Sequence, residues 1–381
     1  MLAALTRSIR SFLRFSRRQY LLLLATLLLS PLVPATPALV VANWNDYIHP
    51  ELLARFTAET GIQVDYRTYE TDEEALALLR QEFPPDVVVP DSSYLPELIK
   101  EGLLQPIPVR SLPASDDIDP LILSRLSSAD PKRQYTVPYF WGRIGIVMDR
   151  ERVERALGGP AGRSWGLLLD PQQLAKLSNC GATLLDARQK FFAIWMNWHG
   201  ALAERPSARE QRAFLQALID LRPHVRAVDN LAYLEDMPAG RQCIAMAWEG
   251  DARAIVTANP RLELFIPDEG STVYVDTLVV PAKSRMADQA WRFIEFMSRP
   301  EIAYLNTRHV LYNSPYKSVT RSLLANHGDD AGWHSLRAIG SGKGISLLSV
   351  DNQSEEVAAA WARFVGEREN GLAIGAIKNK P

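Results

Sequence analysis

The stretch that decides the fold class, residues 39–90, reads LVVANWNDYIHPELLARFTAETGIQVDYRTYETDEEALALLRQEFPPDVVVP. Short runs that are apolar or alternate with period two predict strands over residues 39–44, 62–66 and 86–90. The segments between them have the spacing of amphipathic helices, over residues 50–60 and 70–80. Strands that alternate with helices in this way predict a parallel α/β sheet.

Parallel sheets bind ligands at the carboxyl ends of their strands. In this chain, those ends carry Trp44 to Tyr47 after the first strand and Asp91 to Tyr94 after the third. Beyond them, residues 106–133 are rich in Pro, Ser and Asp, as in a linker. A second α/β unit follows, with strands expected over residues 144–148, 183–186, 243–248 and 274–281 and a helix over 288–298.

The overall composition is that of a folded globular protein. The chain has 381 residues, of which 47% are hydrophobic, with 42 Lys and Arg against 44 Asp and Glu. These values exclude the disordered, collagen-like, disulfide-scaffold and polytopic membrane classes. A nucleic-acid binder would carry a basic domain or stripe, so no nucleic-acid partner is expected.

The N-terminal segment, residues 1–38, differs from the rest in charge. It has five Arg and no acidic residue, then an apolar run over 20–29 and small residues up to Ala38. These are the three parts of a secretory signal peptide, although an uncleaved anchor is the alternative. Residues 16–21 also resemble a twin-arginine export signal. Removing the segment leaves 37 basic against 44 acidic residues, a formal charge of −7.

Both cysteines, Cys180 and Cys243, lie in the exported part of the chain. An oxidising compartment would allow one disulfide between them, and two separate buried thiols are the alternative. Their spacing fits no metal site, and the six histidines are scattered, so neither a metal nor a cofactor is expected.

Motifs of the common enzyme classes are absent from the sequence. It contains no phosphate-binding G-x-x-x-x-G-K-[ST] loop, no G-x-G-x-x-G opening a helix and no G-x-S-x-G elbow. We therefore expect a protein that is not an enzyme. A hydrolase or lyase acting on an amine is the alternative, and it would need Ser92 or Ser93 beside a histidine.

Aromatic residues paired with carboxylates recur at the predicted strand ends. The pairs are Trp44 with Asp46 and Tyr47, Trp248 with Asp251, and Tyr274 with Asp276, and further acids stand at Asp91 and Asp186. An alkylammonium ligand calls for this mixture, because ring faces hold methylene groups and carboxylates accept charge-assisted hydrogen bonds. The simpler interpretation is that Asp186 and Asp251 cap helices and that single Trp residues fill the core.

Several segments together resemble the periplasmic polyamine-binding proteins of bacterial ABC transporters, the spermidine/putrescine-binding class. They are residues 43–48, 56–64, 86–90, 137–142, 185–188, 248–252, 275–278 and 312–315. The resemblance implies a type II periplasmic-binding-protein fold, with two α/β lobes and a ligand cleft between them. It implies a signal peptide over 1–38, lobe 1 over 39–142 plus 276–320, and lobe 2 over 143–275 plus 321–381, with chain crossings near Trp141-Gly142, near Tyr274–Asp276 and after Pro315.

The resemblance also implies a set of ligand-binding residues: Trp44, Asp46, Tyr47, Asp91, Ser92, Asp186, Gln189, Trp248, Asp251, Tyr274, Asp276 and Tyr312. Two of these depart from the family pattern. Gln189 stands where the family usually has Glu, which removes a negative charge, and Asp91 stands where it usually has Ser, which adds one. The ligand is therefore expected to differ in length or charge from spermidine or putrescine.

The resulting hypothesis is a monomeric periplasmic protein that captures a cationic, polyamine-like amine and delivers it to a transporter permease. Closure of the lobes would remove water from the carboxylates and rings and so strengthen their contacts with the ligand. A periplasmic sensor that signals to a membrane partner is the alternative, because a fold alone does not separate the two.

Overall fold

The computed structural model describes residues 37–201, 206–327, 344–346, 355–366 and 378–379. Nearly all of the export signal expected over 1–38 lies outside these ranges. Within them, no helix combines the length and the hydropathy needed to span a bilayer.

The first lobe is built on a four-stranded sheet with the order β11-β2-β1-β3. Its strands are β1 (Leu39–Trp44), β2 (Val64–Tyr69), β3 (Val87–Val88) and β11 (Lys378–Asn379). β1 pairs in parallel with β2 and β3, which confirms the predicted parallel sheet, whereas β11 pairs antiparallel with β2. β3 is shorter than predicted, because the chain around Val88 and Pro90 bonds instead to Val279 and Thr277.

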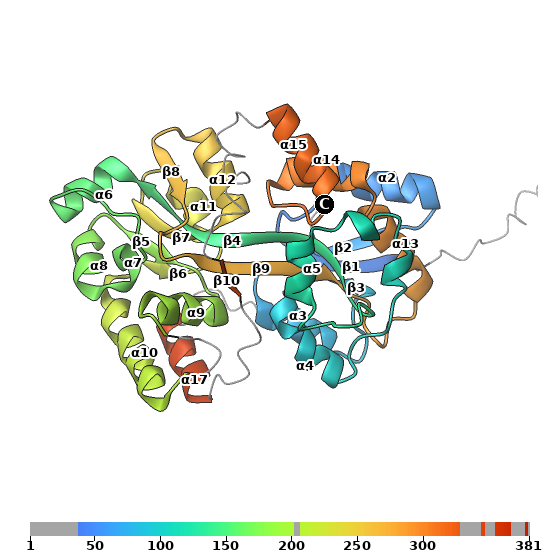
Figure 1. Cartoon of the computed structure of the whole chain (residues 1–381), viewed down its shortest axis with the longest axis horizontal. Coiled ribbons are helices and arrows are strands. Elements are labelled where there is room, and N and C mark those ends of the chain that lie inside the picture. Colours follow the sequence, from blue (N-terminus) through green and yellow to red (C-terminus); the bar gives the residue numbers. More distant parts are fainter. Residues whose placement is uncertain (1–36, 202–205, 328–343, 347–354, 367–377, 380–381) are drawn as a thin grey trace, which may run out of the picture. The chain divides into compact units, whose positions relative to one another are not determined.

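Helices flank this sheet (Figure 1). They are α2 (Pro50–Thr60), α3 (Asp72–Leu79), α4 (Leu95–Lys100), α5 (Pro120–Leu126), α13 (Ala287–Met297), α14 (Pro300–Val310) and α15 (Lys317–His327). α2 has the predicted bounds and ends at Gly61, whose φ of 74° is the left-handed conformation that favours glycine. The segment expected to be a linker contains α5, because the Asp119 side chain caps its first turn and Ile122 and Leu126 are buried.

The second lobe is built on a larger, mixed sheet. Its strands are β4 (Val137–Asp149), β5 (Ala182–Leu184), β6 (Ala227–Val228), β7 (Ile244–Trp248), β8 (Leu262–Phe265), β9 (Ser271–Leu278) and β10 (Gly344–Ser346). β5 pairs in parallel with β6 and β7, as the α/β pattern predicts. The antiparallel pairings are those of the long strand β4 with β7, β8 and β9.

The helices of this lobe are α6 (Arg150–Leu157), α7 (Gly166–Leu169), α8 (Pro171–Leu177), α9 (Arg188–Trp198), α10 (Ala208–Leu221), α11 (Ala232–Asp236), α12 (Glu249–Ala258) and α17 (Glu355–Val365). Cys180 follows α8, Cys243 precedes β7, and the two are joined in a disulfide. Of the two alternatives left open by the sequence, the structure therefore has the disulfide.

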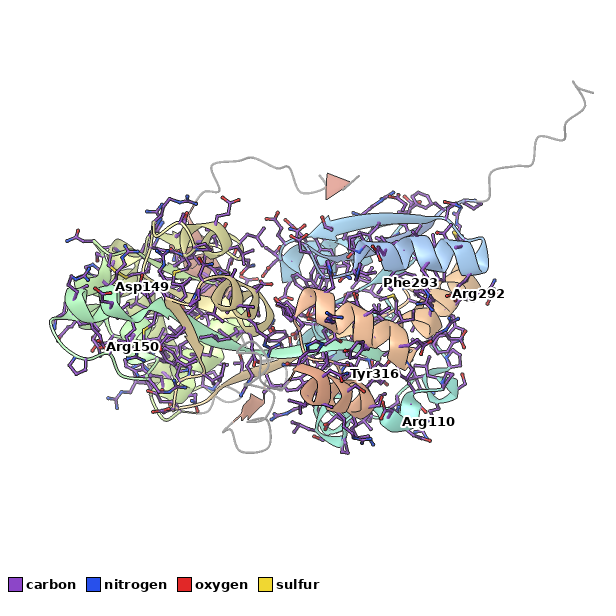
Figure 2. All side chains as sticks on the ribbon, turned by 90° about the horizontal axis from the view of Figure 1, so that it is seen from above. Arg110, Asp149, Arg150, Arg292, Phe293 and Tyr316 are labelled. Carbon is purple, nitrogen blue, oxygen red and sulfur yellow. A yellow bond between two sulfur atoms is a disulfide. The ribbon has the colours of Figure 1, made fainter. Side chains whose placement is uncertain are left out.

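β4 and β9 run side by side from one lobe to the other (Figure 1), paired from Val137↔Leu278 to Arg143↔Val273. In Figure 2, Asp149 at the end of β4 lies in the second lobe and Tyr316 in the first. This confirms the two-lobed α/β fold and the crossings expected near Trp141-Gly142 and Tyr274–Asp276. The chain is still in the first lobe at α15, which packs on α14. The described segment from Pro315 to His327 thus contains no crossing, and residues 328–343, which follow it, lie outside the described ranges.

A buried ion network lies where the lobes meet. Arg143 of β4 and Arg253 of α12 both donate to the carboxylate of Glu249, at 2.9 and 3.0 Å. Arg253 also donates to Asn313 Oδ1 at 3.1 Å and to the carbonyl oxygen of Leu311. The network thus fixes the start of α12 against β4 and against the segment that follows α14.

Candidate functional site: an acidic, aromatic pocket

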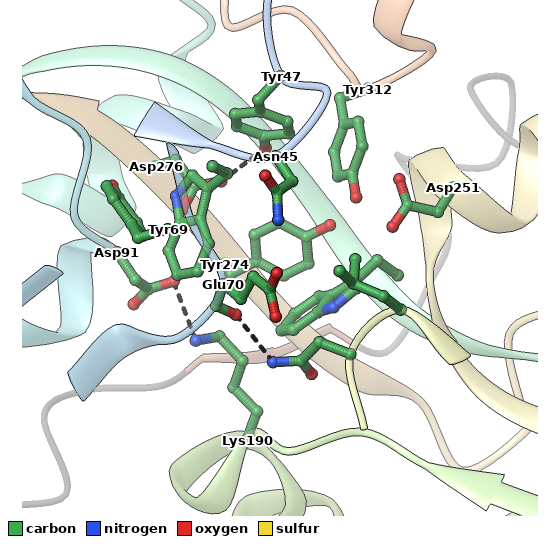
Figure 3. Close-up of a pocket in the computed structure, with 14 residues that line it drawn as sticks. Asn45, Tyr47, Tyr69, Glu70, Asp91, Lys190, Asp251, Tyr274, Asp276 and Tyr312 are labelled. Carbon is green, nitrogen blue, oxygen red and sulfur yellow. Dashed lines mark hydrogen bonds and ion pairs between the residues drawn. The ribbon is translucent and has the colours of Figure 1, made fainter. Parts of the chain in front are cut away.

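A pocket of about 540 Å³, open solvent at its mouth included, lies at the carboxyl ends of β1, β2 and β7 and beside β9 (Figure 3). From the first lobe it is lined by Trp44, Asn45, Tyr47, Tyr69, Glu70, Asp91 and Tyr312. From the second lobe and β9 it is lined by Lys190, Asn230, Leu231, Trp248, Asp251, Tyr274 and Asp276.

Asp276 is a buried acid of the pocket, with 5% of its surface exposed, and it has a hydrogen-bond partner within the pocket. The Tyr47 hydroxyl donates a 2.6 Å hydrogen bond to Asp276 Oδ2. The Tyr139 hydroxyl in turn donates to the Tyr47 carbonyl oxygen at 2.8 Å. This bond fixes the backbone of the loop that follows β1. Burial and the nearby Asp91 raise the pKa of Asp276 well above its usual value, and the hydrogen bond from Tyr47 opposes the shift. A cation bound beside Asp276 would favour the charged form of this carboxyl and so oppose the shift.

Trp44 and Tyr69 form the aromatic wall of the pocket on the first lobe, and one backbone carbonyl group holds both side chains. Trp44 Nε1 and the Tyr69 hydroxyl both donate to the Val89 carbonyl oxygen, at 2.9 and 2.6 Å. Their rings meet edge to face with centroids 4.7 Å apart. The strand ends of β1, β2 and β3 therefore present a rigid apolar surface against which methylene groups can pack.

Asp91 stands at the edge of this wall, directly after Pro90. Its Oδ1 accepts a 2.8 Å hydrogen bond from the Ser93 backbone, which caps the short 3₁₀ turn Ser92–Tyr94. Its backbone forms a bridge with that of Asp276, so the two carboxylates belong to neighbouring strand positions. The residue that caps this turn is thus also one of the pocket acids.

The second lobe contributes a ring pair and a third acid. Trp248 and Tyr274 meet edge to face with centroids 5.1 Å apart. Asp251, in the first turn of α12, accepts a 2.9 Å hydrogen bond from the Tyr233 hydroxyl. Burial raises the pKa of Asp251 to about 6, although hydrogen bonds from Tyr233 and Tyr312 oppose the shift. Its carboxylate therefore changes charge close to neutral pH.

Two glycines make room for the tyrosine rings of the pocket. A Cβ atom added at Gly250 would overlap the Tyr312 ring, and one added at Gly142 would overlap the Tyr274 hydroxyl. The backbone of α12 thus lies against the Tyr312 ring, and the backbone of β4 lies against Tyr274. A larger residue at either glycine would displace the tyrosine that it contacts.

Most of the predicted site residues line this pocket: Trp44, Tyr47, Asp91, Trp248, Asp251, Tyr274, Asp276 and Tyr312. The helix-cap alternative does not hold for the two acids to which it applied. Trp248, not Asp251, is at the cap position of α12, and Ala187, not Asp186, is at that of α9. The aromatic residues and carboxylates at the predicted strand ends therefore lie, for the most part, around the same pocket.

Four predicted residues do not line the pocket. Asp46 is exposed, has a backbone φ of 51° and is not among the lining residues. Ser92 lies within the 3₁₀ turn. Asp186 accepts a 2.9 Å hydrogen bond from Trp361 Nε1, so its carboxylate faces α17. Gln189 is on α9, one position before the residue of that helix that reaches the pocket.

Six lining residues were not predicted: Asn45, Tyr69, Glu70, Lys190, Asn230 and Leu231. Tyr69 and Glu70 stand at the carboxyl end of β2, the same position as Trp44 on β1, and were missed because the strand was expected to end at Tyr66. Lys190 and Asn230 carry no signal in the sequence, because their place depends on how α9 and the loop after β6 pack.

Comparisons with known proteins agree with the fold. A family model described as bacterial extracellular solute-binding protein matches residues 51–313. The putrescine-binding periplasmic protein PotF of Escherichia coli is 31% identical over 77% of this chain and 81% of its own. A putrescine/agmatine-binding protein of Pseudomonas aeruginosa is 31% identical over 71% of this chain and 76% of its own.

A solved structure has the same fold. The spermidine/putrescine ABC transporter substrate-binding protein PotD of Streptococcus pneumoniae superposes with a TM-score of 0.66 at 25% identity, covering 86% of this chain and 97% of its own. Residues 51–313, which the family model matches, include both strands that connect the lobes and all of the lining residues except Trp44, Asn45 and Tyr47. The chain therefore belongs to the family of bacterial extracellular solute-binding proteins.

Proposed function

We propose that this protein captures a cationic amine between its lobes and delivers it to the permease of an ABC transporter. The observation that carries the proposal is the charge of the pocket. Four of its lining residues are acids, Glu70, Asp91, Asp251 and Asp276, and they stand among aromatic rings from both lobes. An alkylammonium ion matches both features, since carboxylates bind its charged end and rings bind its methylene groups.

The relatives support the same class of ligand and the same location. Their names describe putrescine-binding and putrescine/agmatine-binding proteins, and that of PotF adds the periplasm. For this chain, a periplasmic location agrees with the export segment expected over 1–38, by either the general or the twin-arginine route. Binding without chemical conversion of the ligand is the corresponding role, and the expected assembly is a monomer that docks on the permease.

For the lobes, the proposed division is residues 39–142 plus 276–320 and residues 143–275 plus 321–381. One detail favours a later boundary in the first lobe. α15 packs on α14 and extends to His327. Movement of the lobes would then bend the chain within β4 and β9, near the network of Arg143, Glu249 and Arg253.

Isothermal titration calorimetry with ligand-free protein tests the ligand class. The panel consists of putrescine, cadaverine, spermidine, agmatine and N-acetylputrescine, with glutarate, a dianion of similar length, as the control. Micromolar or tighter binding of at least one amine, and none of glutarate, is expected. Binding of glutarate alone would reject a cationic ligand. Uptake of the bound amine by cells with and without the gene then separates transport from sensing.

A further inference from the structure

Lys190 places an ammonium group inside the acidic pocket (Figure 3). Its side chain extends from α9 of the second lobe and is 3% exposed. Nζ lies 3.2 Å from Asp72 Oδ2 and 3.4 Å from Asp91 Oδ2, both on the first lobe. It also lies 5.6 Å from the centroid of the Trp248 ring. Lys190 therefore forms ion pairs between the two lobes next to the space left for a ligand.

The surroundings of Lys190 are those that a bound amine would need. The lysine side chain is itself a four-carbon alkylammonium, and it contacts two carboxylates and one aromatic ring. Burial opposes its charged form, but Asp72 and Asp91 outweigh burial and raise the pKa of Lys190. The charge on Lys190 is thus maintained at physiological pH, and it balances one of the two negative charges of Asp72 and Asp91 before a ligand arrives.

The rest of the pocket offers three further acids, Glu70, Asp251 and Asp276, and neutral hydrogen-bonding groups. Neither Asp276 nor Asp251 forms an ion pair with Lys190, although Asp276 lies beside Asp91 and interacts electrostatically with Lys190. The buried Tyr274 hydroxyl and the Asn230 Oδ1 atom have no hydrogen-bond partner among the described residues. Buried polar atoms without partners are costly, and an uncharged amide or hydroxyl group on a ligand would satisfy them.

We infer that Lys190 occupies one ammonium subsite of the pocket, so that the ligand carries a single ammonium group and an uncharged polar end. The ammonium binds near Asp276 and Asp251, and the uncharged end lies beside Lys190. This inference rests on the proposed function and narrows its ligand from diamines to monocationic amines. A second ammonium at the end that faces Lys190 would be repelled by a like charge within a poorly solvated site.

Calorimetry with two ligands of related length and different charge tests this inference. N-acetylputrescine has one ammonium and an uncharged amide, whereas putrescine has two ammonium groups. The wild-type protein is expected to bind N-acetylputrescine at least tenfold more tightly than putrescine. Lys190→Met removes the ammonium at similar side-chain length, frees Asp72 and Asp91, and is expected to tighten putrescine binding at least tenfold. Lys176→Met, at an exposed position of α8, is the matched control and should leave both affinities unchanged.

The outcomes separate this inference from the function on which it rests. Equal or tighter binding of putrescine by the wild type overturns the role of Lys190 and leaves an amine-binding protein. Absence of binding by every amine of the panel rejects the proposed function, and this inference with it. Circular dichroism checks that Lys190→Met is folded; if it is not, the wild-type comparison of the two ligands decides alone.

Discussion

The Tyr47 hydroxyl and the Asp276 carboxylate, 229 residues apart in the sequence, meet in a 2.6 Å hydrogen bond at the pocket. Tyr47 follows β1 of the first lobe, and Asp276 lies on β9, which connects the lobes. The bond therefore orients the buried acid and links the strand end that carries Trp44 to the interlobe strand.

Tyr47→Phe should weaken amine binding about tenfold, because a hydrogen bond to a charged acceptor contributes about 1.5–3 kcal/mol and its loss also favours protonation of Asp276. Calorimetry at pH 7 measures the change. Tyr304→Phe, at a half-buried position of α14, is the control and should bind as the wild type does. An unchanged affinity in Tyr47→Phe would show that Asp276 does not depend on this hydroxyl.

Amine affinity should fall as the pH is lowered through about 6. The pKa of Asp251 is raised to about 6, so its carboxylate loses charge below that pH and the attraction for a cation weakens by up to tenfold per pH unit. Asp251→Asn should bind more weakly at pH 8 and show a flatter pH profile, measured by calorimetry between pH 5 and 8. A profile as steep as that of the wild type would exclude Asp251 from the binding site.

The free energy of unfolding of the ligand-free protein should change with pH in the opposite direction to amine affinity: the Asp251 contribution should rise as the pH is lowered. A carboxyl whose pKa is higher in the folded state than in the unfolded state takes up a proton on folding, so it stabilises the fold as the pH falls from about 6 towards its ordinary value of 3.8. The free energy of unfolding, measured with urea at pH 7 and at pH 5, should therefore increase less on lowering the pH in Asp251→Asn than in the wild type. The same gain in both proteins would contradict the raised pKa.

Gly250→Ala should weaken ligand binding at least tenfold, since the added methyl group overlaps the Tyr312 ring. Overpacking of this kind costs about 1–3 kcal/mol, whereas alanine by itself favours a helix such as α12. Gly159→Ala adds the same methyl group where no atom lies within 4 Å and is the matched control. If the two variants bind alike, Tyr312 does not shape the pocket.

Reduction of the Cys180–Cys243 disulfide should lower the free energy of unfolding by about 2–4 kcal/mol, because the bond closes a loop with a sequence separation of 63. Amine affinity should stay the same, since neither cysteine lines the pocket. Urea unfolding with and without reductant measures the effect, and a variant with both cysteines replaced by alanine should not respond to reductant. A response in that variant would mean that the reductant acts elsewhere.

The sequence predicted the fold class and much of the pocket because both depend on local patterns. The alternation of strand and helix over 39–90 defines the sheet, and ligands bind at the ends of such strands. Trp44, Trp248 and Asp276 follow from that rule together with the resemblance to a known family. Tyr69 and Glu70 would also have followed if β2 had been expected to extend to Tyr69.

Other features depend on tertiary packing, which a local pattern does not contain. Lys190 and Gln189 are adjacent on α9, and the rotation of the helix decides which of them enters the pocket. Asp186 is an acid at a strand end, as a site residue is expected to be. Its carboxylate instead accepts a hydrogen bond from Trp361, 175 positions away in the sequence. The pairing of Cys180 with Cys243 likewise depends on the arrangement of α8 and β7.

The most direct test of amine binding at this pocket is calorimetry of Asp276→Ala with the amine that the wild type binds most tightly. Removal of the central carboxylate is expected to weaken binding at least a hundredfold, while Asp288→Ala, which removes an exposed acid of α13, should have no effect. Equal affinities of Asp276→Ala and the wild type would contradict an amine site centred on Asp276.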